Sequence, residues 1–385
     1  MRTDWHHTDE VSREVDREVE GWRRAIHGAF GSEPRAIDFR YAVLGALVTG
    51  IPLALGTATG HQTIGLFASL GGLNVGLGLS AGSRANRLHW GLVVLIGTST
   101  GVALATLVGS SGWLLVMTTF TWVGAWTLVR VAGPAGILVA FINSAVFIIV
   151  AGQRLPAADA VTHTIAYAVG GVVSLAVFLV FVTPTEATQT EGSTADQDPS
   201  QRAGATIRLI RESLNSDKRP IRYSIVTGAV IAFATIIELA ASLTEGYWVP
   251  LAGVAVIQPD VGSTRVRALQ RTSGTMIGVA LAALVVGITS NKTVLIAMVF
   301  VVAGALFALK DRGYHWLVIL LTPTVIIMLA AVSSKTWALL EARVIDNALG
   351  ILLVLALVEL MGWISHRFRT HRTPNHPDGS GSLVR

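Results

Sequence analysis

Long apolar stretches alternate with short polar ones along the chain, and this pattern is the first guide to its fold. Twelve apolar segments follow one another, at residues 40–58, 62–80, 88–109, 112–131, 133–151, 160–182, 221–243, 246–259, 269–288, 293–309, 313–332 and 344–364. A run of about 20 apolar residues is long enough to cross a ~30 Å hydrocarbon core. The pattern therefore predicts an all-α polytopic membrane protein with about 12 transmembrane helices.

Three polar stretches divide the chain into its expected parts. Residues 1–39 carry an apolar stripe at helical spacing, formed by Val11, Val15, Val19, Trp22, Ile26 and Phe30. Such a stripe predicts an amphipathic helix that lies on the cytoplasmic membrane surface or against the bundle. Residues 183–220 read as a cytoplasmic linker and residues 365–385 as a basic cytoplasmic tail. Two membrane units remain, 40–182 and 221–364.

The two membrane units resemble each other in sequence. Arg40-Tyr41 opens the first unit and Arg222-Tyr223 the second, and the run Gly101–Gly109 matches Gly278–Gly287. Between these landmarks an ordered series lines up: Gly65, Phe67, Leu70, Gly72 and Val75 with Gly246, Trp248, Leu251, Gly253 and Val256. Six spans are an even number, so the sequence predicts two parallel six-helix repeats, an arrangement typical of transporters with a path at the repeat interface.

The distribution of basic residues predicts the orientation in the membrane. If the N-terminus is cytoplasmic and the spans alternate, the inside segments carry 25 Lys and Arg and the outside segments carry 4. Cytoplasmic loops are rich in Lys and Arg because positive charges resist translocation. We therefore expect a multi-pass protein of the inner (plasma) membrane with both termini in the cytoplasm, and we assign the basic charge to orientation rather than to nucleic-acid binding.

Several classes of chemistry have no sequence support. The chain has no cysteine, which excludes disulfides, thiolate catalysis and cysteine-ligated metal clusters. Phosphate-binding loops, zinc-protease motifs and nucleophile elbows are also missing from the sequence. We expect no enzyme activity, no cofactor and no metal site.

Glycine and proline gather in the second and eighth apolar segments. Transporter sites often lie where such residues interrupt corresponding spans of two repeats, although close helix packing explains glycines equally well. The eighth segment runs into a stretch with Asp260, Arg265, Arg267 and Arg271, expected as a loop at the cytoplasmic mouth. These arginines either collect anionic substrates or anchor the loop to lipid headgroups and Asp260.

The second unit resembles a known family. The run Tyr247-Trp248-Val249-Pro250, then Gln258-Pro259-Asp260, then Thr264 to Arg271 and Gly274-Thr275, is similar to the signature of the fusaric acid resistance (FUSC) family of integral membrane transporters. Arg343-x-x-Asp346-Asn347-x-x-Gly350 resembles a second family pattern, with Asn347 where the family has threonine. The first unit matches only weakly and lacks the Gln-Pro-Asp element.

The resemblance implies efflux of aromatic carboxylic acids or related organic anions. The residues expected to bind substrate or line its path are Tyr247, Trp248, Pro250, Gln258, Pro259, Asp260, Arg265, Arg267, Arg271 and Thr275. Trp248, beside the short eighth segment, could stack an aromatic ring. Larger family members carry a long cytoplasmic domain between the units, and here only the 183–220 linker stands in its place.

Four ionisable residues in apolar segments are candidates for proton coupling: Asp346, Arg343, Glu238 and His163. Charges at the bilayer centre cost about 2.5–3.5 kcal/mol on insertion scales, so each invites a functional explanation. Arg343 and Asp346 could equally form a structural salt bridge one helical turn apart. His163 lies roughly where Asp346 falls in the other unit, and a lone membrane histidine is often simply hydrogen-bonded.

Three interpretations of function remain open at this point. The favoured one is a secondary exporter of organic anions, above all aromatic carboxylic acids, with coupling to protons left open. A channel-like anion pathway and a non-transporting membrane scaffold are the alternatives. The expected partners are the lipid bilayer and a small organic anion, with a homo-oligomer or a periplasmic accessory protein left open.

Overall fold

A computed structural model describes residues 38–79, 83–182, 199–241, 243, 245–332 and 336–370. Every regular element in these ranges is helical, and the described part contains no strand. Nine of its helices are long and apolar enough to cross a membrane. The chain is therefore an all-α membrane protein, as the apolar pattern predicts.

The helices of the first unit follow the predicted segments closely. They are α2 (Phe39–Ala58), α3 (Gln62–Gly78), α4 (Arg84–Val108), α5 (Gly112–Leu128), α6 (Pro134–Gly152) and α7 (Ala160–Phe181), with the short 3-10 turns η1 (Val129–Ala132) and η2 (Ala157–Asp159). Local chemistry sets several ends. Asp38 and Ser83 cap the N-termini of α2 and α4 with side-chain hydrogen bonds. Gly133 adopts a φ of 84° before Pro134, which occupies the first turn of α6.

The remaining helices belong to the linker and the second unit. They are α8 (Pro199–Ser216), α9 (Arg219–Ala240), α10 (Trp248–Val256), α11 (Val261–Ile288), α12 (Lys292–Leu309), α13 (Tyr314–Val332) and α14 (Thr336–Thr370), with the turn η4 (Lys310–Arg312) between α12 and α13. The amphipathic N-terminal segment and the basic tail predicted above lie outside the described residues.

Three features differ from the sequence-based expectation. The helix α10 has only 9 residues, and all of them are buried. The segment with Arg265, Arg267 and Arg271 is the beginning of α11 and not a loop, because Asp260 caps that helix ahead of the arginines. The helix α3 is continuous through its glycines, which serve close packing: a Cβ on Gly71 would overlap the backbone oxygen of Tyr167 in α7.

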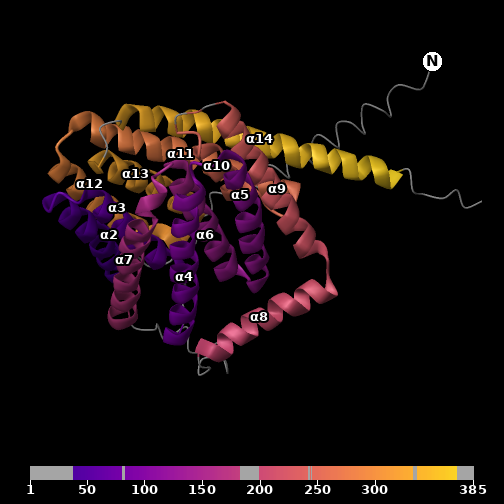
Figure 1. The fold of residues 1–385 in the computed structure, drawn as a ribbon, viewed down its shortest axis with the longest axis horizontal. Coiled ribbons are helices and arrows are strands. Elements are labelled where there is room, and N and C mark those ends of the chain that lie inside the picture. Colours follow the sequence, from indigo (N-terminus) through magenta and orange to yellow (C-terminus); the bar gives the residue numbers. More distant parts are fainter. Residues whose placement is uncertain are drawn as a thin grey trace, which may run out of the picture.

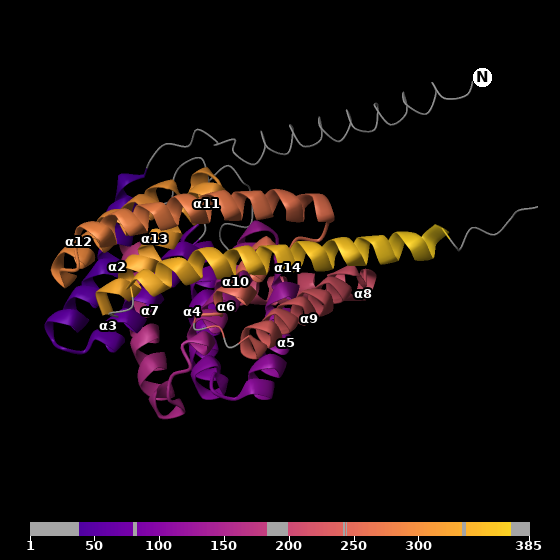
Figure 2. The ribbon, with the colours of Figure 1, turned by 90° about the horizontal axis from the view of Figure 1, so that it is seen from above.

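Each unit packs its helices by a similar scheme. In the first, α3 packs on α7, and α4 packs on α6 and α7; in the second, α10 packs on α14, and α11 packs on α13 and α14. The most extensive contacts between the units are those of α2 with α12 and of α5 with α9, and α6 also meets α10 and α3 meets α13. In both views α11 and α14 follow the long axis of the molecule, whereas α4 and α7 run steeply across it (Figures 1 and 2).

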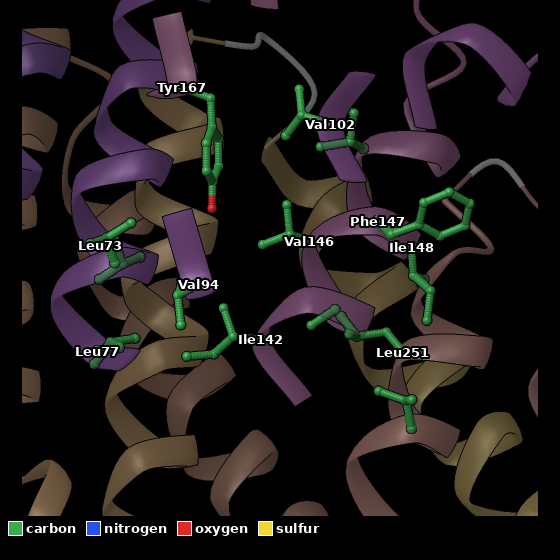
Figure 3. Close-up of a cluster of buried hydrophobic side chains, with 14 of the residues drawn as sticks. Leu73, Leu77, Val94, Val102, Ile142, Val146, Phe147, Ile148, Tyr167 and Leu251 are labelled. Carbon is green, nitrogen blue, oxygen red and sulfur yellow. The ribbon is translucent and has the colours of Figure 1, made fainter. Parts of the chain in front are cut away.

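One buried apolar cluster continues from one unit into the other. It includes Leu73 of α3, Val94 of α4, Ile142 of α6 and Leu251 of α10 (Figure 3). Lipid tails are as apolar as these side chains, so dispersion and close packing, more than exclusion of water, hold such helices together. The amphipathic α8 lies across one end of α4 and turns back into α9 (Figure 1).

Candidate functional site

A small, mostly apolar cavity of about 50 Å³ lies between the two units. Its lining comes from α3 and α6 of the first unit and from α10, α11, α13 and α14 of the second. Most lining side chains are aliphatic, but Asn74, Trp248, Arg271 and Arg343 bring polar groups to it. The arrangement therefore places two guanidinium groups at an otherwise largely apolar cavity.

Arg343 lies against the face of an indole. Its guanidinium carbon is 3.8 Å from the ring centroid of Trp248, and the two residues are 4% and 1% exposed. Among the described residues, Nε and Nη1 of Arg343 and Nε1 of Trp248 have no hydrogen-bond partner. The indole offsets part of the desolvation of the cation, but the two unpaired guanidinium nitrogens leave capacity for an anionic acceptor.

Arg271 is the second buried guanidinium at this cavity. Its Nε donates a hydrogen bond to Oδ1 of Asn347 over 3.3 Å, and the residue is 2% exposed. Asn347 is neutral, so it orients Arg271 without cancelling its charge. Among the described residues no carboxylate lies within ion-pair distance of Arg271 or Arg343.

A wider vestibule of about 270 Å³ adjoins the cavity and shares Leu138, Phe141 and Leu317 with it. Arg130 of η1 donates a 2.8 Å hydrogen bond to Gln258, which follows α10. Arg267 of α11 stacks over Tyr314 at 3.9 Å from the ring centroid. The vestibule is therefore lined by two more arginines, one from each unit.

Two tyrosines close the C-terminal end of α10. Tyr223 donates a hydrogen bond to the carbonyl of Ile257 over 3.1 Å, and Tyr314 donates one to Ala255 over 3.3 Å. These bonds satisfy carbonyls that a helix end leaves without intrahelical partners. Arg130 also lies over the Tyr223 ring, at 5.3 Å from its centroid. The C-terminal end of α10 therefore faces the vestibule with the carbonyls of Ala255 and Ile257 already hydrogen-bonded.

An outer hollow of about 510 Å³ continues the vestibule at the first turns of α11. We call it the α11 hollow; it is lined by Gln258, Gly262, Ser263, Val266, Arg267 and Gln270. Gln258 and Arg267 line both spaces. The hollow, the vestibule and the cavity therefore follow one another from the end of the bundle inward, and arginines occur at each stage.

Asp260 and Arg265 each make a structural contact that accounts for a charged side chain at their position. Asp260 accepts a 2.8 Å hydrogen bond from the Ser263 backbone at the start of α11, and hydrogen bonds from Ser263 hold the pKa of Asp260 below its usual value. Arg265 donates a 2.7 Å hydrogen bond to Glu359 of α14 and lines none of the three spaces. Of the predicted arginines, Arg267 and Arg271 face the path and Arg265 faces away.

The other predicted pathway residues lie around the same short helix. Tyr247 is 1% exposed, stacks on Trp248 at 4.6 Å between centroids, and packs against Gly152 of α6. Pro250 is buried within α10, and Pro259 lies in the turn between α10 and α11. Thr275 of α11 is 1% exposed and its hydroxyl has no partner. None of these four lines the cavity itself, but Tyr247 and Pro250 flank its Trp248 wall.

The proton-coupling candidates fall into two groups. Glu238 is 3% exposed and lies 4.0 Å from Arg154, near the C-terminal end of α9, whereas Asp346 is 4% exposed and precedes Asn347, the hydrogen-bond partner of Arg271. Within the described part no ion pair joins Arg343 to Asp346. His163 stacks on Phe67 with centroids 4.3 Å apart, and its Nδ1 has no partner.

The stacking pairs revise one correspondence between the units. Phe67 lines up with Trp248 in sequence, so the residue that stacks on Phe67 should match the one that stacks on Trp248. That residue is His163 in the first unit and Arg343 in the second. His163 therefore corresponds to Arg343, one helical turn from the Asp346 position to which the sequence comparison assigned it.

Sequence reasoning overlooked Arg130, Tyr223 and Tyr314 as parts of the site. The recurring Arg-Tyr dipeptides contained a signal. Tyr223 meets Arg130, and its counterpart Tyr41 meets Lys310 at 5.4 Å from the ring centroid. The repeated tyrosine marks a position where each unit meets a basic residue of the other, which could be found only once the partners were known.

Comparison with known proteins shows similarity in the second unit. Residues 230–357 match the fusaric acid resistance protein-like family. The protein ORF2 of Neisseria gonorrhoeae is 27% identical over 43% of this chain and 39% of its own length. The inner membrane protein YccS of Escherichia coli is 24% identical over 46% of this chain and 24% of its own, and the membrane protein YvaC of Bacillus subtilis is 31% identical over 40% and 24%.

The aligned part thus covers less than half the length of each of these relatives. No solved structure matches the chain. The family match contains α10, α11 and the Arg343 segment, which supply part of the cavity lining.

Proposed function

We propose, from the premise that residues 230–357 form a fusaric acid resistance protein-like segment, that this membrane protein is a secondary transporter exporting organic anions, aromatic carboxylic acids above all. The substrate enters at the α11 hollow, passes the vestibule and reaches the cavity at Arg271 and Arg343. The inner (plasma) membrane is its location, as the printed name of the relative YccS states for that protein.

The observation that carries this proposal is the pair of buried guanidinium groups at one cavity. Burying an ionised group without a counter-charge is costly, and buried charges are normally paired. Arg271 has only an amide and Arg343 only an indole and vacant donor positions. An anion that arrives in the cavity supplies the missing counter-charge, so this site favours anions over cations and neutral molecules.

The lining indicates the class of anion. Trp248 and Phe141 contribute aromatic rings to the lining, and the aliphatic residues around them offer no polar group to a substrate. A carboxylate on an aromatic or apolar body suits a site with charge at one wall and hydrocarbon elsewhere. At about 50 Å³ the cavity is too small for such a molecule, so the Leu138, Phe141 and Leu317 contact must open for transport.

Two parallel six-helix repeats explain the packing of the chain. The cross-unit pairs Tyr223–Arg130 and Tyr41–Lys310, and the within-unit pairs Trp248–Arg343 and Phe67–His163, occur at matching positions. Helix pairs α2–α12 and α9–α5 match in the same way. The spans of the two repeats are inclined to each other, so they cross the bilayer tilted. Both termini and the vestibule face the cytoplasm, in keeping with the positive-inside rule.

Proton coupling completes the proposal. Glu238, Asp346 and His163 are buried groups that can gain or lose a proton, and they lie on helices of both units. Buried Asp, Glu and His side chains form the proton relays of pumps and transporters, so groups of this kind can couple export to the proton gradient. We assign the coupling to Glu238 and Asp346 first, because Arg154 offers Glu238 an alternative partner to the proton.

Flux measurements in proteoliposomes test the function. Benzoate flux is expected to follow an imposed pH gradient, to be lost in Arg343→Gln and Arg271→Gln, and to persist in Arg265→Gln, whose side chain pairs with Glu359 away from the path. Loss of flux in all three variants would point to folding rather than to the cavity, and a thermal-unfolding measurement on each variant separates the two. No benzoate flux in the wild type under any gradient would refute the proposal.

A channel-like pathway is the second candidate, because the α11 hollow, the vestibule and the cavity share lining residues one after the other. Planar-bilayer recording discriminates: a channel gives single-channel currents that are independent of the pH gradient. A membrane scaffold predicts neither flux nor current, together with a partner that co-purifies in fixed stoichiometry.

A further inference from the structure

An apolar groove, which we call the α4–α5 groove, opens on the surface of the first unit. It has a volume of about 780 Å³ and is lined by one face of α4 between His89 and Thr100, by Trp122, Ala125 and Trp126 of α5, and by Val129 of η1. Small-molecule sites typically enclose about 300–1,000 Å³. Among the described residues, none lines both this groove and the cavity, the vestibule or the α11 hollow. The groove is therefore separate from the proposed anion path.

The groove exists because α4 and α5 both pack on α6 and meet each other much less. On the α5 side, Trp122 Nε1 donates a 3.1 Å hydrogen bond to the backbone carbonyl of Asn143 in α6, and the Trp122 ring stacks on Phe147. Trp126 meets Trp122 edge to face, with the ring centroids 6.0 Å apart. A Cβ on Gly97 of α4 would overlap the Trp126 ring. Packing therefore fixes both indoles, and the groove is preformed.

The length of the groove matches one leaflet of a bilayer. Between His89 and Thr100, α4 rises about 16 Å, and half of a ~30 Å hydrocarbon core is ~15 Å. Ile96 on the groove wall is 64% exposed, so the groove is open to lipid along its side. The Thr100 hydroxyl donates a 2.8 Å hydrogen bond to the Ile96 carbonyl of its own helix, which satisfies this polar group. An acyl chain in the groove would run from the headgroup level to near the bilayer centre.

The helix α8 crosses the end of the groove at His89. The Thr206 hydroxyl of α8 lies 3.4 Å from Nε2 of His89, and α8 packs on both α4 and η1. From the foot of α4 it runs to α9, which packs on α5 (Figure 1). The part of α8 that follows Thr206 therefore lies along the mouth between α4 and α5, at the level of the lipid headgroups.

This part of α8 is positively charged. The helix contains three arginines and one glutamate. Arg208 and Arg211 are exposed, and in the part of the chain that the structure describes neither forms an ion pair. Ile207, 66% exposed, lies one turn before Arg211. One flank of α8 therefore offers an apolar side chain beside a guanidinium, a combination typical of helices that lie in a membrane interface.

We propose that the α4–α5 groove binds one anionic phospholipid, with an acyl chain between α4 and α5 and the phosphate at Arg208 and Arg211. Any phospholipid has an acyl chain of suitable length, so the arginines select the headgroup, as basic clusters on amphipathic helices and between membrane helices do. The bound lipid contacts α4, α5 and α8 and so attaches the linker helix to the first unit. The inference does not depend on the proposed function, because the groove and the anion path share no residue among those described.

Native mass spectrometry of the full-length protein in detergent tests the choice of headgroup. Dioleoyl phosphatidylglycerol and dioleoyl phosphatidylcholine carry the same acyl chains and differ in headgroup charge. The wild type should bind one phosphatidylglycerol about 25-fold more tightly than one phosphatidylcholine, since each of two arginines near an anionic headgroup contributes about fivefold. Arg208→Gln combined with Arg211→Gln should bind the two lipids equally. Equal binding by the wild type, or an unchanged preference in the double variant, would overturn the proposal.

Filling the groove tests the place of the acyl chain. Ala125 and Ala176 are both exposed and lie in the last two turns of α5 and α7, and only Ala125 of the two lines the groove. Ala125→Trp should therefore remove phosphatidylglycerol binding, and Ala176→Trp should retain it. Loss in both variants, or in neither, contradicts the placement. The same spectra report the oligomeric state: a lipid-free dimer that dissociates only in Ala125→Trp would assign the groove to a second copy of the chain and overturn the lipid.

A smaller substitution keeps the test decisive if Ala125→Trp folds poorly. The chain has no native cysteine, so Ala125→Cys and Ala176→Cys each carry a single thiol. Phosphatidylglycerol at ten times its Kd should slow labelling of Ala125→Cys by N-ethylmaleimide about tenfold, because the bound chain covers the thiol. Labelling of Ala176→Cys should not change. Equal protection by phosphatidylcholine, or no protection at residue 125, would refute the lipid site.

Discussion

The guanidinium carbon of Arg343 lies 3.8 Å above the indole of Trp248, with both residues almost fully buried between α10 and α14. The two helices approach closely at Gly350, where a Cβ would overlap the backbone oxygen of Val249. Close packing therefore holds a cation against an aromatic face beside the cavity. A cation–π contact of this kind contributes about 2 kcal/mol when desolvated, less than a buried charge costs. The remaining deficit is what an anion would supply.

Replacing the indole tests that contact. Trp248→Leu should weaken benzoate binding about tenfold, because the cation–π contribution is lost and Arg343 becomes free to leave the cavity wall. Trp248→Phe keeps an aromatic face and should lose less. The measurement is the concentration dependence of flux. Equal behaviour of the two variants would show that the ring acts by volume alone.

A new carboxylate at Asn347 should strongly reduce anion flux through the cavity. Asn347 Oδ1 accepts a 3.3 Å hydrogen bond from Arg271, so Asn347→Asp places a negative charge there and neutralises the guanidinium. We expect anion flux to fall at least about tenfold at neutral pH, because the new carboxylate takes the place of the transported anion as the counter-charge of Arg271. Asn347→Leu, similar in size but uncharged, is the control and should retain more flux. If Asn347→Asp is the more active of the two, Arg271 does not bind the anion.

The Gly350 contact should be sensitive to a single methyl group. Gly350→Ala improves helix propensity but forces α14 away from Val249, and overpacking of this kind costs about 1–3 kcal/mol. Gly287→Ala, in open space on α11, gains about 0.8–1 kcal/mol of helix propensity with no clash. Thermal unfolding in detergent should therefore shift down for the first variant and up for the second. A shift in the same direction for both would contradict the packing described for α10 and α14.

Asp260 should make the start of α11 sensitive to acid. Hydrogen bonds from Ser263 lower the pKa of Asp260 in the folded protein, so the ionised cap stabilises the fold above the ordinary Asp pKa. That stability is lost as the pH falls through the lowered pKa. Asp260→Ala should cost about 1 kcal/mol at neutral pH and less in acid. Asp260→Asn caps the helix without titrating, so its stability relative to the alanine variant should not depend on pH.

Much of the helical framework could be predicted from the sequence. The apolar segments predict most described helices to within a few residues, with α10, the start of α11 and both ends of α14 as the main exceptions. The first two exceptions have a local cause in the sequence. Pro259 and the cap Asp260 end one helix and begin the next, and a cap allows charged residues to enter a helix that hydropathy alone begins later.

The partners of the charged residues were the least predictable part. Arg343 and Asp346 are one turn apart and suggest an ion pair, but α10 packs against the Arg343 side of α14 and offers an indole instead. Arg265, Arg267 and Arg271 look alike in sequence. Because their side chains point in different directions around α11, Arg265 meets Glu359, Arg267 meets Tyr314 and Arg271 meets Asn347.

The sequence by itself determined the helical, membrane-spanning character of the chain and the resemblance of its second unit to the fusaric acid resistance family, since apolar run length and motif spacing are local properties. Only the tertiary structure decided which arginines meet at one cavity and which residue stacks on which ring. Those contacts join residues that are far apart in the sequence, 128 positions for Arg130 and Gln258, and they depend on which helix faces are in contact. Periodicity along one helix carries no information about the face that a distant helix presents to it.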